Sequence, residues 1–407
     1  MGMYCGIDWA EGHHDVALVD DDGVVRANRR INTEAEGFSD LLAMLAEHVD
    51  DPTEVAVAIE TDKNLMVVAL RAAGITVYAI NPRSVARYRE RYRQAGGKSD
   101  AVDALVLANI LRTDRHAHRA LPTISEHALA VRALARQHQE AVWARQLTVN
   151  RLRSVLLEFY PGALQAFPNL THQAALTILK AAPTPGDGQK LTRRRIVALL
   201  RRSGRGDRVG LAETIQAALR IPQLRQPACV EVALGHTLVG LVEIVLTMQA
   251  SIAQLESELA VEFHAHPMAA ILKSAPGLGP VLAARVLAEI GDDPTRFTTA
   301  DGLRAFAGTA PITRASGRTR IVSARRIRNK RLANALHWWA FSAITKSAGA
   351  RGHYDRRRAA GDSHNAALRN LANKLLGRMW WCLANGCLWD EMAAWPLLES
   401  ERERVAA

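Results

Sequence analysis

The sequence contains few cysteines for its length. Only Cys5, Cys229, Cys382 and Cys387 occur among 407 residues, and no two of them form a CxxC pair. We therefore expect neither a disulfide framework nor a structural zinc site. The cysteines should be reduced, as in a cytoplasmic protein. Hydrophobic residues make up 48% and charged residues 23% of the chain. This composition predicts a folded protein of two or three domains and excludes a disordered or collagen-like chain.

The sequence also lacks a long uninterrupted hydrophobic run. The longest stretch without Asp, Glu, Lys or Arg spans residues 159–179, and Pro161 and Pro168 interrupt it. The first fifteen residues contain neither a basic segment nor an apolar segment of the kind that signal peptides have. We therefore expect no transmembrane helix, no signal peptide and no membrane partner.

Charge is distributed unevenly along the chain. Residues 1–110 carry 11 basic and 18 acidic side chains, whereas residues 111–407 carry 41 basic and 23 acidic ones. The overall net charge of +11 favours a polyanionic partner, and nucleic acid is the expected one. The acidic region would repel phosphate, so it is either solvated surface or a site where a bound cation reverses the local charge.

The first part of the chain predicts an α/β fold. Short strands are expected over residues 3–8, 15–20 and 24–31, followed by helices over 34–48 and 63–73 that alternate with strands over 54–60 and 75–81. The first three strands follow one another closely and should form an antiparallel meander, whereas the strands separated by helices should be parallel. The order βββαβαβα, with a final helix from about Ser99, is that of an RNase H-like, or RuvC-like, fold. The related actin and sugar-kinase fold is the alternative. It is disfavoured because bulky residues follow Asp8 and no Gly-rich phosphate loop follows Ile59.

Four acidic residues occupy related positions in this predicted domain. Asp8 and Glu60 end two strands, and Asp100 and Asp103 are three residues apart on one face of the final helix. Such a set suits two Mg²⁺ ions, or Mn²⁺ in their place, roughly 4 Å apart for phosphoryl transfer. Individually, the helix acids are also explained by the helix dipole, and Glu60 by surface exposure.

The residues that follow Asp8 form a second, weaker candidate group. His13, His14 and Asp15 are interpreted as loop residues that lie near the acidic site.

The middle of the chain predicts two long helices. Residues 125–159 are helical in pattern, and a later helix has apolar residues at alternating spacings of three and four, which is typical of a coiled coil. These residues are Leu238, Leu241, Val245, Met248, Ile252, Leu255 and Leu259. The predicted domains are therefore residues 1–124, a stalk over 125–265 with a small insertion over about 160–235, and a mainly α domain over 266–407. Within the insertion, the segment 190–208 has eight basic residues and is either a solvated helix face or a binding surface.

Two features of the last domain predict contacts with nucleic acid. The segment 274–292 resembles a helix-hairpin-helix, in which Gly277 and Gly279 let backbone amides approach a phosphate. The segment 312–332 has no acidic residue and eight basic ones, which predicts salt-sensitive binding to phosphates. The eight are Arg314, Arg318, Arg320, Arg325, Arg326, Arg328, Lys330 and Arg331. Trp338 and Trp339 follow, and their apolar neighbours favour core packing over base stacking.

Ser316 lies inside the basic segment. A serine hydroxyl is a weak nucleophile without a base or a metal, so the residues alone favour a loop serine that touches phosphate. Nearby guanidinium groups would stabilise the charge of a phosphoryl-transfer transition state if Ser316 did attack.

Taken together, these motifs resemble one family across most of the chain: the insertion-sequence transposases with a DEDD RuvC-like domain and a C-terminal serine domain, also called bridge-RNA-guided recombinases. The motifs are GIDW, AIE and KSDAVDA with the four acids, APGLGPVLAARVLAEIGD, and GTAPITRASGRTR with Ser316. The resemblance implies that the four acids bind Mg²⁺ and that Ser316 forms a 5′-phosphoserine link to DNA. It also implies a structured noncoding guide RNA and a dimer or tetramer in which one subunit's serine completes another subunit's acidic site.

Two other functions remain open at this point. A RuvC-like nuclease would hydrolyse DNA with metals and use Ser316 only as a contact. A nonenzymatic nucleic-acid-binding protein is disfavoured because the four acids would weaken binding unless a metal occupied them.

Overall fold

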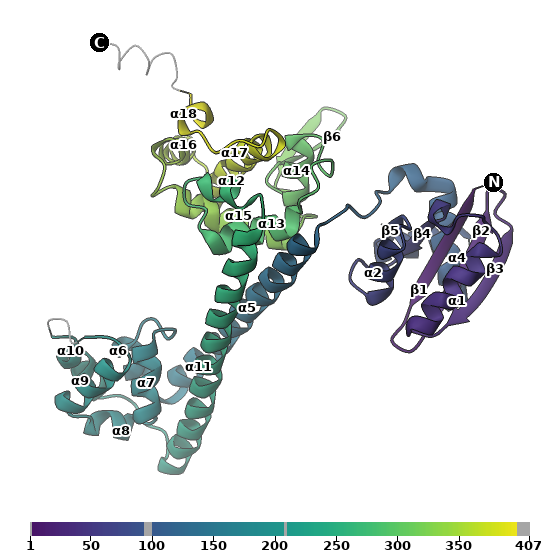
Figure 1. The fold of residues 1–407 in the computed structure, drawn as a ribbon. Coiled ribbons are helices and arrows are strands. Elements are labelled where there is room, and N and C mark those ends of the chain that lie inside the picture. Colours follow the sequence, from purple (N-terminus) through teal and green to yellow (C-terminus); the bar gives the residue numbers. More distant parts are fainter. Residues whose placement is uncertain (1, 93–99, 207–209, 397–407) are drawn as a thin grey trace, which may run out of the picture. The chain divides into compact units, whose positions relative to one another are not determined.

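The computed structural model describes residues 2–92, 100–206 and 210–396 (Figure 1). The chain divides into two compact units, Met1–Thr123 and Ile124–Ala407, which are described separately below. The further division predicted between residues 265 and 266 stays a prediction.

The N-terminal unit is built on a five-stranded sheet with the order β3-β2-β1-β4-β5. The first three strands pair antiparallel, and β4 and β5 add parallel to β1. The predicted antiparallel meander followed by parallel strands is therefore confirmed. The bounds are β1 Met3–Trp9, β2 His14–Asp20, β3 Val25–Ile31, β4 Ala56–Ile59 and β5 Val77–Ala79.

Helices cover both faces of this sheet, as its apolar strands require. Cys5 and Ile7 share one core with α1 and α2, whereas Ala56, Ala58 and Tyr78 share the opposite core with α3 and α4. Neighbouring side chains of a strand point to opposite faces, so β1, β4 and β5 contribute to both cores. The bounds are α1 Ala35–Ala46, α2 Leu65–Ala72, α3 Pro82–Tyr92 and α4 Asp100–Asp114, with short 3-10 turns η1 Pro52–Glu54 and η2 Arg115–Ala117.

Helix α4 lies against β1 and runs antiparallel to it. A Cβ at Gly6 would be 2.0 Å from the carbonyl oxygen of Ala104, so only glycine lets the helix approach this closely. Near the other end of α4, Arg112 donates a hydrogen bond to the carbonyl of Asp21, whose carboxylate binds the amide of Gly2 before β1. The first turns of α4 therefore lie at the end of β1 that carries Asp8.

Two long helices dominate the C-terminal unit, α5 Glu126–Phe159 and α11 Ala228–Ala265. They run antiparallel, since His127 pairs with Glu262, and His138 with Glu256 (Figure 1). All seven residues of the predicted α11 seam are buried or half-buried. Side-by-side packing is thus observed, and knobs-into-holes coiled-coil geometry stays a prediction.

Helix α11 is also the one helix among the described residues that is long and apolar enough to cross a membrane by length and composition. The same helix packs along α5, and its residues Leu238, Val245 and Leu259 are fully buried in the unit. The stretch 159–179 is broken into separate helices, α6 Pro161–Ala166 and α7 Gln173–Ala181, as its prolines predict.

Short helices lie between α5 and α11, and α6, α7, α9 and α10 share a separate core with one end of this pair. In α9, Ile196 and Leu199 point into that core and the arginines are exposed. Asp207 and Arg208 of the basic segment lie outside the described residues. The bounds are α6 Pro161–Ala166, α7 Gln173–Ala181, α8 Pro185–Lys190, α9 Arg193–Arg202 and α10 Leu211–Arg220.

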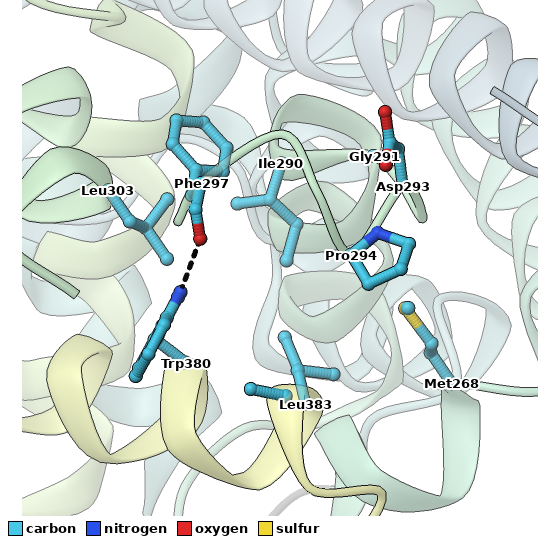
Figure 2. A pocket seen from close by; sticks show the side chains of 10 residues that line it. Met268, Ile290, Gly291, Asp293, Pro294, Phe297, Leu303, Trp380 and Leu383 are labelled. Carbon is cyan, nitrogen blue, oxygen red and sulfur yellow. Dashed lines mark hydrogen bonds between the residues drawn. The ribbon is translucent and has the colours of Figure 1, made fainter. Parts of the chain in front are cut away.

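The other end of the long pair carries a mainly helical core with one β-hairpin, and the predicted mainly α character of this region is confirmed. A small apolar cavity of about 40 Å³ lies in this core. Beside it, Trp380 Nε1 donates a 2.9 Å hydrogen bond to the carbonyl of Phe297 (Figure 2). Such a volume is a packing feature rather than a substrate site. The bounds are α12 Ala269–Ser274, α13 Pro280–Ile290, α14 Ala300–Ala307, β6 Ile312–Ser316, β7 Thr319–Ser323, α15 Lys330–Ala343, α16 Ala348–Ala359, α17 His364–Ala384 and α18 Glu391–Ala394.

Candidate functional site

Two of the predicted acids occupy neighbouring positions at one end of the sheet. Asp8 is in β1, two residues beyond Gly6, and alternation places it on the face that α4 covers. Strand β4 is parallel to β1 with Ile7 beside Ile59, so Glu60 follows at the level of Asp8. Both residues are half-buried. The sheet topology therefore brings these two acids together, although they are far apart in sequence.

Helix α4 supplies the other two predicted acids at the same end. Asp103 is only 4% exposed and accepts hydrogen bonds from Arg89 of α3, 2.7 Å from Nε to Oδ1 and 2.6 Å from Nη2 to Oδ2. Asp100 begins α4, but its side chain, like Ser99 before it, lies outside the described residues. The start of α4, which carries Asp103, therefore lies at the same end of the sheet as Asp8. Arg89 neutralises the charge of Asp103.

The interpretation of residues 13–15 as a loop is wrong for two of them. His14 and Asp15 are the buried first residues of β2, because the turn after β1 already closes when Ala10 donates to the carbonyl of His13. Burial lowers the pKa of His14 below its ordinary value. Asp15 lies directly opposite Asp8 and binds Arg30 through two hydrogen bonds of 3.0 and 3.1 Å. The sequence analysis named Asp15 near the acidic site but did not predict that it pairs with Asp8 across the sheet.

Carboxylate oxygens are the ligands that Mg²⁺ prefers, so the donor type of Asp8, Glu60 and Asp103 fits a divalent metal. Among the described side chains, no three of the His, Cys, Asp and Glu residues form a group that could hold a metal ion. Asp103 would have to exchange Arg89 for the metal, and Asp100 would have to join from outside the described side chains.

Ser316 lies at the tip of an exposed β-hairpin. It ends β6 and pairs with Thr319, the first residue of β7, across a two-residue turn of Gly317 and Arg318. Gly317 has φ +55°, the backbone conformation that such a turn requires at its first central residue. Sequence reasoning treated Ser316 as a loop residue. The β-branched residues on both sides of Ser-Gly-Arg-Thr were the signal for a hairpin.

The hairpin presents Ser316 together with basic side chains. Arg314 is on the same face as Ser316, Arg320 is on the opposite face, and Arg318 is in the turn. Residues 313–322 are all exposed. None of the residues that the structure describes forms a hydrogen bond with the Ser316 hydroxyl, so a general base for Ser316 is missing from this described set.

The basic residues that follow the hairpin have two kinds of surroundings. Arg331 pairs with Glu140 and lies over the ring of Trp143 at 5.4 Å, so it also packs α15 against α5. Arg328 lies against Gly308, where a Cβ would be 2.2 Å from its Cδ. Arg325 is half-buried, and Arg326, Arg328 and Lys330 are exposed. Most of the predicted basic cluster is therefore available to phosphate.

The predicted helix-hairpin-helix segment forms α12, a tight turn and α13. Gly277 has φ +76°, and a Cβ there would be 2.6 Å from the amide nitrogen of Ala343, so the turn packs against the end of α15. Gly279 is exposed and precedes the first turn of α13 with open space around it. Packing accounts for Gly277, and a phosphate contact at Gly279 stays a prediction.

The adjacent tryptophans have different surroundings. Trp339 is fully buried and donates a 3.0 Å hydrogen bond to the carbonyl of Pro276, so core packing is confirmed for it. Trp338 is 49% exposed, and core packing is wrong for it because the helix rotates by about 100° per residue and turns it away from the buried side of α15.

Comparison with known proteins identifies the family. Residues 5–161 match a family described as transposase, and residues 269–355 match the transposase IS116/IS110/IS902 family. The IS117 mini-circle protein of Streptomyces coelicolor is 49% identical over 98% of both chains. The chain belongs to the IS116/IS110/IS902 family of transposases. It is therefore an enzyme of DNA rearrangement.

More distant relatives align with the transposase along nearly its whole length. The 43.6 kDa protein of insertion element IS110 from Streptomyces coelicolor is 28% identical over 96% of both chains. The 42 kDa protein of insertion element IS900 from Mycobacterium paratuberculosis is 28% identical over 93% of this chain and 94% of its own. Among solved structures, T. thermophilus RuvC in complex with a Holliday junction substrate is 21% identical, with a TM-score of 0.23, over 30% of this chain and 100% of its own.

A buried acid of the transposase that sequence reasoning missed fixes the base of the Ser316 hairpin. Glu289 of α13 is 2% exposed and accepts hydrogen bonds of 2.8 and 3.0 Å from Arg136 of α5. It also accepts a 2.7 Å bond from Asn329, which caps α15 where the chain returns from the hairpin. Burial alone would raise the pKa of Glu289, but the bonds from Arg136 and Asn329 hold it below its ordinary value.

We expect Glu289→Gln to lower the free energy of unfolding by about 3 kcal/mol, because the buried partner of an ion pair loses its charge and the half-buried Arg136 loses its counter-charge. Urea titration followed by circular dichroism measures this change. Glu213→Gln is the matched control, since its pair with Arg193 is well exposed and should contribute less than about 1 kcal/mol. Equal effects of the two substitutions would show that Glu289 does not organise this core.

Proposed function

We propose that the transposase cleaves and rejoins DNA through Ser316, with the acids Asp8, Glu60, Asp100 and Asp103 holding a divalent metal. The observation that carries this proposal is the position of Ser316. The serine lies at the exposed tip of a hairpin within a segment of eight basic residues and no acid. A serine that only packed against the core or capped a helix would not need to lie at an exposed tip among basic residues.

The reaction exchanges one phosphate ester for another. Ser316 Oγ attacks the phosphorus of a DNA phosphodiester and loses its proton, while the bond from phosphorus to the 3′-oxygen breaks and that oxygen takes up a proton. The products are a 5′-phosphoserine link and a free 3′-hydroxyl, which rejoins a strand by the reverse reaction. Arg314, on the same face of the hairpin, is placed to stabilise the charge that develops on the phosphate.

The acidic end of the sheet supports the other half of the proposal. Asp8 and Glu60 would hold the metal from neighbouring strands, with Asp100 and Asp103 joining from α4. A bound divalent ion acts as a Lewis acid on phosphate oxygens and lowers the barrier to attack by a hydroxyl. Asp15 and its partner Arg30 would fix the strand register opposite Asp8.

Ser316 and the acids belong to different compact units. Within the proposal, the serine of one subunit meets the acids of another in a homo-oligomer, either a dimer or a tetramer. A structured noncoding RNA selects donor and target DNA by base pairing, and the basic surfaces hold the backbones of the nucleic acids. The enzyme then works in the cytoplasm, at the nucleoid, without a membrane partner.

The test is to detect and locate the covalent link. The full-length protein is incubated with Mg²⁺, the RNA that copurifies with it and plasmid DNA carrying the ends of its insertion sequence. Denaturing electrophoresis is expected to show a protein–DNA adduct, and nuclease digestion followed by mass spectrometry should place the residual nucleotide on Ser316. Cleaved DNA with free 5′-phosphates and no linked protein would instead support a metal-dependent RuvC-like nuclease.

A further inference from the structure

A cluster of aromatic rings lies half-exposed on the C-terminal unit. Trp338 and Phe341 of α15 are each 49% exposed and meet edge to face, with ring centroids 6.0 Å apart. His337 contacts Trp338 at 5.6 Å, and His364 of α17 contacts Phe341 at 6.4 Å. We call these four residues the aromatic ledge. Exposing two large rings side by side costs solvation free energy, which stacking against a flat partner would recover.

A pocket of about 590 Å³ adjoins this ledge and shares His337 with it. None of the residues that line it, all of which the structure describes, is acidic. The lining combines cationic, amide and aromatic side chains, including Trp143, Arg328, Lys330, Asn334, His337 and Arg369. We call it the basic pocket. Its volume lies in the range that small-molecule ligands of the size of a nucleotide occupy.

The walls of the basic pocket are held in place by neighbouring groups. The guanidinium of Arg331 covers Trp143 from one side at 5.4 Å. Asn334 Oδ1 accepts hydrogen bonds from Arg285 at 2.7 Å and from Gln139 at 3.2 Å. Burial and the nearby charge of Arg331 lower the pKa of Arg285 to about 10. The side chains of the pocket are therefore held in place by hydrogen bonds and ring contacts, and Arg328, Lys330 and Arg369 make the pocket cationic.

We propose that the basic pocket and the aromatic ledge bind an unpaired nucleotide of a single-stranded nucleic acid. The rings of Trp338 and Phe341 stack with bases, while Arg328, Lys330 and Arg369 contact the phosphates. This site deepens the proposed function, because it gives the transposase a place to hold the strand segments that base pairing leaves open.

The chemistry favours single strands over the other possible occupants. In a duplex, the flat faces of the bases are already stacked, so an aromatic surface finds no partner there. A protein helix would satisfy the rings but would leave the cations of the pocket without counter-charges unless it were acidic. An unpaired nucleotide supplies both a flat ring and a phosphate.

The site is distinct from the place where Ser316 would react. Gly308 and Thr309 before the hairpin and Arg328 after it line the pocket, so the pocket lies at the base of the hairpin. Ser316 ends β6, four residues beyond the first strand residue Ile312, which corresponds to roughly 13 Å of strand. The bound nucleotide is therefore not the one attacked by Ser316.

The proposal is tested with fluorescently labelled oligonucleotides of one sequence, as single-stranded RNA, single-stranded DNA and duplex DNA. Full-length transposase is freed of copurified nucleic acid, and binding is followed by fluorescence anisotropy. We expect Trp338→Ala to weaken single-strand binding about tenfold and duplex binding by less than twofold. Trp338→Phe should retain most of the binding, because a ring is kept. Trp381→Ala is the matched control, a similarly exposed tryptophan outside the ledge.

The occupant is then identified directly. A single strand containing 5-iodouridine should crosslink to Trp338 or Phe341 on irradiation, as located by mass spectrometry. If Trp338→Ala weakens the binding of single-stranded RNA more than that of single-stranded DNA, the natural ligand of the site is RNA. The opposite order identifies DNA. Equal effects of Trp338→Ala and Trp381→Ala, or an equal loss of duplex binding, would overturn the proposal. If Trp338→Ala changed the oligomeric state on size-exclusion chromatography but left single-strand binding unchanged, the proposal would also be overturned. The aromatic ledge would then be a protein interface.

These results separate this site from the proposed function. A transposase without a Ser316 adduct but with Trp338-dependent binding of single strands would refute serine chemistry and keep the stacking site. An adduct on Ser316 with no effect of Trp338→Ala would do the reverse.

Discussion

Replacing Ser316 by alanine is expected to abolish the protein–DNA adduct and to reduce strand exchange by a factor of about 10⁴ or more. Removing the nucleophile of an enzyme that works through a covalent intermediate removes the reaction path itself, and losses of about 10⁶-fold are known for such changes. The measurement is the yield of adduct and of rejoined strands on denaturing gels, with the copurified RNA and Mg²⁺ present.

The position of Ser316 makes this substitution easy to interpret. The residue is exposed at the hairpin tip, so Ser316→Ala should change the free energy of unfolding by less than about 0.5 kcal/mol. Ser323→Ala, at the other end of the same hairpin, is the matched control and should keep full adduct yield. If cleavage survived in Ser316→Ala with the same products, the serine would be only a phosphate contact.

Much of the N-terminal fold follows from local patterns. The alternation in Asp15–Asp20 and the apolar residues of Ala56–Ile59 predict strands, and both strands are present with the predicted directions. Parallel strands also put Asp8 and Glu60 at the same end of a sheet, which is a geometric consequence of topology. The acidic pair is therefore predictable without knowledge of any contact.

The parts that sequence reasoning missed depend on distant partners. Glu289 is indistinguishable from a surface acid until Arg136 and Asn329, which are 153 and 40 residues away, surround it. Trp338 and Trp339 differ by one step around a helix, and only the packing of α15 decides which of them is buried. The partner of Asp103, Arg89, comes from a helix whose orientation is set by the sheet.

Replacing Asp8 by asparagine is expected to lower DNA cleavage by about 10³-fold while the fold and RNA binding are kept. An amide is a weaker ligand for Mg²⁺ than a carboxylate, and the Lewis acid supplies several kcal/mol of transition-state stabilisation. Cleavage of plasmid DNA and electrophoretic shifts with the copurified RNA measure the two activities. Asp40→Asn, an exposed acid on α1, is the matched control.

The same variant tests whether Asp8 is a ligand or a structural residue. Asp8 lies opposite Asp15 and beside the position of Glu60. We expect Mg²⁺ to raise the melting temperature of the wild-type protein, since a ligand that binds only the folded state stabilises it, and to lose this effect in Asp8→Asn. A Mg²⁺-dependent shift of equal size in both proteins, or the joint loss of folding and RNA binding, would mean that Asp8 maintains the sheet and that the metal is held elsewhere.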